Sequence, residues 1–107
     1  MTPQQKFEII FTRPVLGHLA TIDRKYHSQI RSTISEQLSY DPEVETRNRK
    51  PLQRLSQLGA TWELRFGPLN RWRVFYETNP DEYEVYILGI GEKVGNQLFI
   101  GGGEAEL

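Results

Sequence analysis

The sequence predicts an α+β domain in which an N-terminal strand and a helical hairpin pack on a mainly antiparallel, four-stranded sheet. Three runs rich in aromatic and β-branched residues alternate between apolar and polar positions, which predicts strands over Trp62–Phe66, Trp72–Thr78 and Tyr83–Ile90. Proline, glycine and asparagine separate these runs at 67–70 and 79–82, where tight turns require their backbone preferences. We therefore expect the three runs to form an antiparallel meander.

The N-terminal third of the chain supplies the remaining strand and the first helix. Lys6–Phe11 alternates in part and predicts a first strand. Thr12 suits the cap of a short helix over Val15–Ala20, and Pro14 suits its first turn.

A longer second helix is expected over Arg24–Tyr40, with Asp23 as its cap. Asp41-Pro42 ends it, because the residue before a proline is pushed out of the helical region. Apolar side chains recur every four residues along this helix, at Tyr26, Ile30, Ile34 and Leu38. We interpret this stripe as core that covers one face of the sheet, in preference to a groove for a partner.

The connection to the meander is polar over Glu43–Pro51, and Leu52, Leu55 and Leu58 then form an apolar rhythm that could pin it to the core. The glycine-rich tail at 101–107 is expected to be flexible. No linker is long enough to divide residues 1–107, so we expect a single domain.

Composition excludes several classes of protein. The chain has no cysteine, which rules out disulfides, cysteine-based zinc sites and thiol nucleophiles. No apolar run approaches the roughly 20 residues of a membrane span, and the N-terminus lacks the pattern of a signal peptide, so we expect a cytoplasmic protein without a membrane partner. His18 and His27 lack a nearby acidic ligand set and are expected at the surface or in packing, so no metal site is predicted.

Basic residues gather in one stretch of a chain whose net charge is −1. From Thr46 to Arg73 there is one acidic residue, Glu63, and seven basic ones: Arg47, Arg49, Lys50, Arg54, Arg65, Arg71 and Arg73. This asymmetry predicts a side that faces a polyanion. The alternative is a solvated loop next to unrelated strand charges.

The polar face of the meander could concentrate charge. Cross-strand neighbours lie about 4.5–5.5 Å apart, so a suitable register would unite four side chains in one cluster: Glu63, Arg65, Arg73 and Glu77. One interpretation is a solvated face with surface ion pairs, which contribute roughly 0–1 kcal/mol each. The other is an anion-binding floor.

The order of elements and four segments resemble the RelE/ParE superfamily of bacterial type II toxins. The segments are TWELRFG at Thr61–Gly67, RWRVFYE at Arg71–Glu77, ILGIGEKVGNQLFIGG at Ile87–Gly102, and the connection Asp41–Leu52. The resemblance implies a small toxin neutralised by a cognate antitoxin protein, with a possible higher-order toxin–antitoxin complex and no cofactor. RelE-like members cleave mRNA in the ribosome without a metal, whereas ParE-like members inhibit DNA gyrase.

Carried over by position, the RelE-like pattern matches Arg65, Arg73 and Lys93 in this chain. Glu63 stands where the family has a basic residue, and Phe99 stands where a tyrosine is often found. The resemblance therefore implies an endoribonuclease acting on ribosome-bound mRNA. The alternatives are a gyrase inhibitor and an inactive domain that only binds an antitoxin through an edge strand or apolar groove.

RNA cleavage needs a base for the 2′-hydroxyl, charge stabilisation at the phosphate and an acid for the leaving oxygen. We assign these roles to Glu63, to Arg65 with Arg73, and to Lys93, respectively. In the alternative interpretation, Glu63 only pairs with Arg65 or Arg73. The expected RNA-binding residues are Arg47, Arg49, Lys50, Arg54, Arg71 and Phe99.

Overall fold

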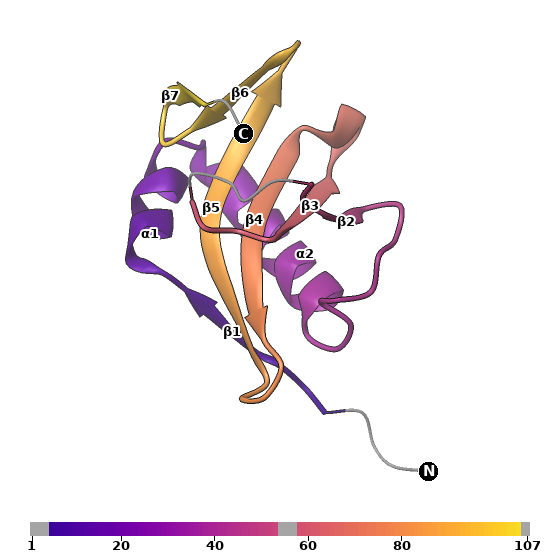
Figure 1. The fold of residues 1–107 in the computed structure, drawn as a ribbon. Coiled ribbons are helices and arrows are strands. Elements are labelled where there is room, and N and C mark those ends of the chain that lie inside the picture. The colour runs from indigo at the N-terminus through magenta and orange to yellow at the C-terminus, as the bar shows by residue number, and fades with distance from the viewer. Residues whose placement is uncertain (1–4, 54–57, 106–107) are drawn as a thin grey trace.

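Strands and helices segregate into two layers in a computed structural model that describes residues 5–53 and 58–105. Within these residues, seven strands form one sheet and two α-helices cover one of its faces (Figure 1). The strands are β1 (Glu8–Phe11), β2 (Arg49–Pro51), β3 (Trp62–Phe66), β4 (Trp72–Asn79), β5 (Glu84–Val94), β6 (Gln97–Ile100) and β7 (Gly103–Ala105). The helices are α1 (Arg13–Ala20) and α2 (His27–Leu38), with 3₁₀ turns η1 (Arg24–Tyr26) and η2 (Pro68–Asn70).

The sheet is antiparallel except at its first strand. Its order is β2-β3-β4-β5-β6-β7, and β1 pairs in parallel with β5. The predicted meander is confirmed as β3, β4 and β5. The predicted count of four strands is wrong, because β2, β6 and β7 add short antiparallel pairings at the two ends of the sheet.

The C-terminal segment turns back on itself, although composition predicted flexibility there. Gly101 and Gly102 adopt positive φ angles of 64° and 83°, which permit the tight turn between β6 and β7. Residues Gly103–Ala105 then pair with β6. The same glycines that predicted a flexible tail therefore form the turn that returns the chain to the sheet.

A β-bulge at Leu88 changes which residues of β5 face each layer. Phe75 pairs with Gly89, whereas the next residue, Tyr76, pairs with Ile87, so Leu88 is left without an opposite residue. Ile87 and Ile90 can therefore both be buried although they are three residues apart. Gly89 consequently lies on the opposite face from the helices, beside Phe75.

The helix bounds differ from those that the sequence predicts: α1 begins two residues earlier than expected, at Arg13, and α2 begins three residues later, at His27. Thr12 precedes α1 but makes no side-chain cap; its hydroxyl donates to the Ile87 carbonyl of β5 over 2.6 Å. Asp23 does act as a cap, but of η1, where it accepts from the Lys25 N–H over 3.0 Å.

Among residues 5–53 and 58–105, no helix has the length and apolar character needed to cross a bilayer.

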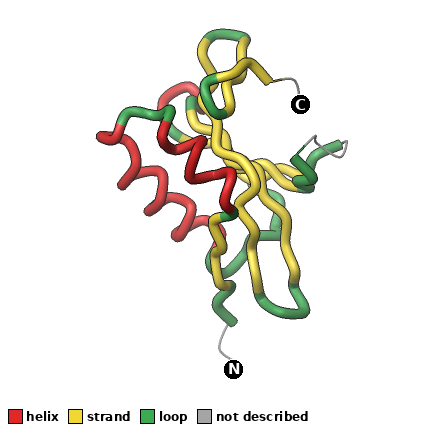
Figure 2. Tube along the Cα trace, turned by 90° about the vertical axis from the view of Figure 1, so that its left-hand side faces the viewer, coloured by secondary structure: helices red, strands yellow, loops and turns green. Residues whose placement is uncertain are grey.

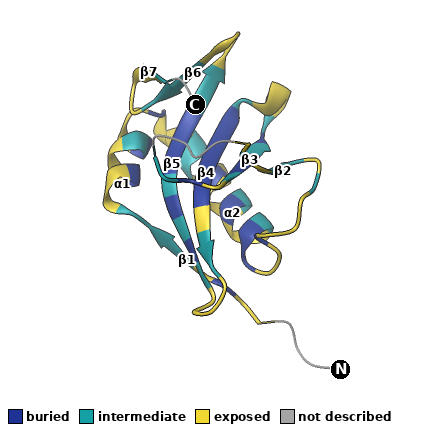
Figure 3. Cartoon of the chain, viewed as in Figure 1, coloured by how far each residue is buried: buried dark blue, intermediate teal, exposed yellow. Residues whose placement is uncertain are grey.

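The core lies between the helices and β3–β5 (Figures 2 and 3). Ile30, Ile34 and Leu38 are fully buried, which confirms the predicted stripe on α2. They face apolar side chains of the central strands, namely Leu64, Trp72, Val74, Tyr76, Val85 and Ile87. The helices therefore cover the central strands on one face of the sheet, and no helix among the described residues covers the other face.

Tyr76 provides a test of this packing because its buried hydroxyl donates to the Pro42 carbonyl over 2.6 Å. Tyr76→Phe should lower the free energy of unfolding by about 1 kcal/mol at pH 7. Burial raises the pKa of Tyr76 above its ordinary value of about 10. The stabilisation is therefore complete below pH 10 and declines above it, as the unfolded tyrosine ionises.

Urea unfolding of both proteins at pH 7 and at pH 11 measures this effect. The difference between wild type and Tyr76→Phe should shrink at the higher pH. A difference that stays constant or grows would contradict the buried, neutral hydroxyl.

Candidate functional site

Three charged side chains meet on the face of the sheet that the helices leave free. Glu63 and Arg65 of β3 and Arg73 of β4 line a cavity of about 460 Å³. Leu52 and Phe75 contribute apolar wall, and the β5–β6 turn, β6 and β7 supply the remaining side through Asn96, Gln97, Leu98, Glu104 and Ala105. Glu77, which the sequence grouped with these residues, is exposed and does not line the cavity.

The register of β3 and β4 sets the distribution of charge in the cavity. Arg65 lies directly opposite Arg73, whereas Glu63 lies opposite Phe75. Like charges at opposed positions of a sheet destabilise it. Glu63 offsets that repulsion because its carboxylate accepts from Nε of Arg65 and lies 3.5 Å from Nη1 of Arg73.

The two arginines differ in how far they reach water. The Arg73 side chain is only 10% exposed and the Glu63 side chain only 7%, whereas the Arg65 side chain is 41% exposed. Arg73 is also anchored through Nε, which donates to the Asn70 carbonyl over 2.9 Å. A fixed guanidinium thus lies at the floor of the cavity, and an accessible one lies at its mouth.

This arrangement leaves hydrogen-bond donors for an anion. Arg65 uses only Nε toward Glu63, and Arg73 uses Nε and Nη1, within the part of the chain that the structure describes. The remaining guanidinium nitrogens are donors that suit the forked geometry of a phosphate. Glu63 therefore pairs with both Arg65 and Arg73 inside an open cavity, and the anion-binding role of this cavity stays a prediction.

Lys93 is close to this cavity in the sheet but does not line it. It lies on β5 two residues beyond Gly91, which pairs with Arg73, and it pairs with the cavity residue Leu98. It lines a neighbouring cavity together with Leu69 and Arg71. Lys93 therefore lies at the rim of the cluster formed by Glu63, Arg65 and Arg73.

The guanidinium of Arg71, a residue predicted to bind RNA, interacts with neighbouring side chains of the protein itself. Its Nε donates to Glu92 over 2.6 Å, and Nη1 lies 3.3 Å from the Tyr26 hydroxyl. Its guanidinium is also 4.7 Å from the ring centroids of both Tyr26 and Trp72. The hydrogen bonds to Glu92 and then to Tyr26 raise the pKa of Arg71.

Phe99 lies on the other face of the sheet and does not line the charged cavity, so the structure does not bring it together with Arg65 and Arg73. It pairs with Glu92 and lines a cavity near the end of α1 with Thr21 and Ile22. Its neighbour Leu98 faces the charged cavity instead. The sequence offered one signal for Leu98, since a hairpin at 94–97 would place it opposite Lys93.

The basic connection divides into structural and accessible residues. Arg49 donates from Nη1 to the carbonyls of Gln37 and Asp41, each over 2.6 Å, and so caps the C-terminal end of α2. Lys50 lies opposite Glu63 in the register and 3.5 Å from Glu45. Arg47 is exposed. Arg54 falls outside the described residues.

Neither histidine reaches the cavity. Nδ1 of His18 accepts from the Ile90 N–H over 3.3 Å, and burial lowers the pKa of this histidine. Nε2 of His27 lies 2.8 Å from the Ile22 carbonyl. Both are packing residues, as the sequence predicted.

Among residues 5–53 and 58–105, no three histidine or acidic side chains group as a metal site would require.

Comparison with known proteins identifies the fold. No family model matches the sequence, and no curated protein matches it. The structure is similar to a chain of the toxin–antitoxin complex RelBE2 from Mycobacterium tuberculosis, with a TM-score of 0.69 and 22% sequence identity. The match covers 87% of this chain and 98% of that one. The predicted RelE/ParE-like fold is therefore confirmed.

The charge balance of the cavity predicts how it binds inorganic phosphate. Glu63→Gln removes the carboxylate that competes for both guanidiniums, so phosphate should bind about tenfold more tightly, since one charge at a partly buried site is worth at least about 1.4 kcal/mol. Arg65→Gln should weaken binding by a similar factor. Calorimetric titration with phosphate measures both effects.

Glu77→Gln is the matched control, because it removes an acid from β4 outside the cavity. Its phosphate affinity should equal that of the wild type. Equal affinities for Glu63→Gln and Glu77→Gln would show that the cavity is not the anion site.

Proposed function

We propose that the protein is the toxin of a type II toxin–antitoxin system and cleaves ribosome-bound mRNA as a metal-independent endoribonuclease. The fold that it shares with a chain of the RelBE2 complex supports a toxin role and an antitoxin partner. The observation that carries the nuclease proposal is the convergence of Arg65, Arg73 and Glu63 in one open cavity.

Substrate binding begins with an exchange of anions. A phosphodiester that enters the cavity contacts the accessible Arg65 first. It then replaces Glu63 as the partner of the guanidinium groups that Glu63 pairs with in the free protein. The phosphate then bridges both guanidiniums through charge-assisted hydrogen bonds. Glu63 loses part of its pairing at the same step and becomes available as a proton acceptor.

The reaction is a transesterification within the RNA. Glu63 accepts the proton of the 2′-hydroxyl, and the 2′-oxygen forms a bond to phosphorus. The bond from phosphorus to the 5′-oxygen of the next nucleotide breaks, and Lys93 protonates that oxygen. The products are a 2′,3′-cyclic phosphate and a free 5′-hydroxyl. Arg65 and Arg73 stabilise the charge that develops on the non-bridging oxygens.

Accessible basic residues outside the cavity would guide the RNA. Arg47 and Lys50 lie on the connection that leads into β3, and Lys50 pairs in register with Glu63. Contacts of these residues with neighbouring phosphates would make binding dependent on salt. Arg54 belongs to the same proposal by its place in the sequence. A ribosomal target also implies a cytoplasmic protein.

Purified protein and translating ribosomes provide the direct test. Arg73→Ala should lower the rate of mRNA cleavage by roughly 10²–10³, because a donor to the transition-state charge is lost. Glu63→Gln should lower kcat by about 10² or more while it tightens substrate binding, because the same carboxylate is both base and competitor. Arg24→Ala, on the exposed η1 turn, should cleave at the rate of the wild type.

Growth, mRNA integrity and gyrase activity distinguish a nuclease from a gyrase inhibitor and from an inactive antitoxin-binding domain. Expression without an antitoxin should arrest growth, and translated mRNA should be cut in the arrested cells. Arrest with intact mRNA and inhibited supercoiling by purified gyrase would establish a ParE-like inhibitor instead. Normal growth on strong expression would establish an inactive antitoxin-binding domain.

A further inference from the structure

The tips of two adjacent hairpins enclose a cavity of about 480 Å³ at one end of the sheet, which we call the tip cavity. The η2 turn between β3 and β4 contributes Pro68 and Leu69, and the β5–β6 hairpin contributes Lys93, Val94 and Gly95. Both tips lie at the same end of the sheet and are largely exposed (Figures 1 and 3). The tip cavity is therefore open to a ligand from solvent.

Leu69 presents its side chain to solvent from a strained backbone. It is 99% exposed, and its φ of 55° and ψ of 30° lie in the left-handed region that bulky residues rarely adopt. Hydrogen bonds hold this conformation, since the Asn70 N–H donates to the Gly67 carbonyl over 3.0 Å and the Arg71 N–H to the Pro68 carbonyl over 3.1 Å. Strain that the surrounding structure enforces is typical of functional sites.

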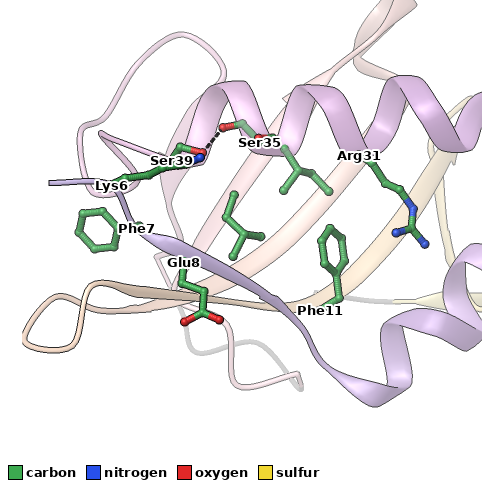
Figure 4. Close-up of a pocket in the computed structure, with 9 residues that line it drawn as sticks. Lys6, Phe7, Glu8, Phe11, Arg31, Ser35 and Ser39 are labelled. Carbon is green, nitrogen blue, oxygen red and sulfur yellow. Dashed lines mark hydrogen bonds between the residues drawn. The ribbon is translucent and has the colours of Figure 1, made fainter. Parts of the chain in front are cut away.

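The tip cavity adjoins the charged cavity. Gly95 lines the tip cavity and the next residue, Asn96, lines the charged cavity, so the two share the β5–β6 turn. The η2 turn is a second connection, because the Asn70 carbonyl, next to Leu69, accepts from Nε of Arg73. The cavity between β1 and α2 has no lining residue in either turn (Figure 4). A ligand built of two linked units could thus occupy the charged cavity and the tip cavity together.

Lys93 gives the tip cavity its charge on the side of the arginines. It lies two residues beyond Gly91, which pairs with Arg73, so both side chains belong to the same face of the sheet. Lys93 is in no ion pair among the described residues, whereas Arg71 and Glu92 neutralise each other over 2.6 Å. A ligand with an anionic part near Lys93 and an apolar part near Leu69 complements this surface.

We propose that the tip cavity holds the nucleoside on the 3′ side of the cleaved bond and that Leu69 contacts its base. This inference rests on the proposed function, in which Lys93 protonates the leaving 5′-oxygen. The nucleoside that carries this oxygen then lies at Lys93, and its base lies between Leu69 and Val94. Contact with the face of a base is tolerant of sequence, because every base has such a face.

The contact would also prepare the RNA for cleavage. In a stacked strand the 2′-oxygen is not in line with the leaving 5′-oxygen, and the reaction requires the reacting atoms to be aligned. Apolar side chains that insert between adjacent bases unstack them. Leu69 is therefore a positioning residue, which sets the geometry of the phosphodiester and touches none of the reacting atoms.

A dinucleotide tests this, because its single phosphate fixes its register against Arg65 and Arg73. The probe is 2′-O-methyladenosine joined through its 3′-phosphate to 2-aminopurine riboside, which cannot be cleaved. The reference ligand, 2′-O-methyladenosine 3′-(methyl phosphate), lacks the second nucleoside. The full chain should bind the dinucleotide about tenfold more tightly than the reference ligand. The fluorescence of 2-aminopurine should rise on binding, because stacking on adenine quenches it.

Leu69→Asn separates binding from stability. Asparagine tolerates the left-handed region better than leucine, so the melting temperature should not fall. The affinity for the dinucleotide should fall to that for the reference ligand, and the rise in fluorescence should disappear. Leu16→Gln is the matched control, because Leu16 is 56% exposed on α1 outside both cavities. This variant should bind both ligands as the wild type does.

The outcomes distinguish failure of this inference from failure of the proposed function. Equal wild-type affinity for the two ligands, or a dinucleotide preference that Leu69→Asn retains, would overturn the inference and leave the phosphate site intact. Binding of neither ligand would overturn both sites. A wild-type dimer that Leu69→Asn dissociates would assign Leu69 to a second copy instead. Intact mRNA on ribosomes, together with the dinucleotide preference, would refute the nuclease and retain the nucleoside site.

Discussion

The bridge from Glu63 to both Arg65 and Arg73 is the interaction on which the charged face of this sheet depends. The register of β3 and β4 sets two arginines directly opposite one another, an arrangement that costs stability by itself. One buried carboxylate between them offsets that cost in the free protein. The same geometry provides a reason for an incoming phosphate to bind, since it can replace the carboxylate at both guanidiniums.

The surrounding fold keeps the cavity on this face of the sheet open. The bulge at Leu88 allows β5 to place glycines, Gly89 and Gly91, on the cavity side while its apolar residues face the helices. A Cβ at Gly91 would lie 2.8 Å from the Phe99 carbonyl oxygen, so the close approach of β6 requires glycine there. The β6–β7 hairpin can therefore form one wall of the cavity without filling it.

Alternating hydrophobicity was enough to predict β3 and most of β4 and β5, and with them the shared face of Arg65 and Arg73. Short-range periodicity could not predict the bulge, because an unpaired residue depends on the neighbouring strand. The family pattern, carried over by position, placed Phe99 in the site. It could not show on which face of the sheet Phe99 lies, because that face depends on the register of the β5–β6 hairpin. Charge alone could not distinguish Arg49, which closes α2, from the accessible Arg47.

A structure of the protein with a 2′-O-methylated RNA oligonucleotide, which binds but cannot be cleaved, tests the central claim most directly. We predict that one phosphate lies within hydrogen-bond distance of both Arg65 and Arg73, that Glu63 has moved from at least one of them, and that the 2′-oxygen faces its carboxylate. RNA bound elsewhere on the protein, with the Glu63 bridge intact, would contradict it.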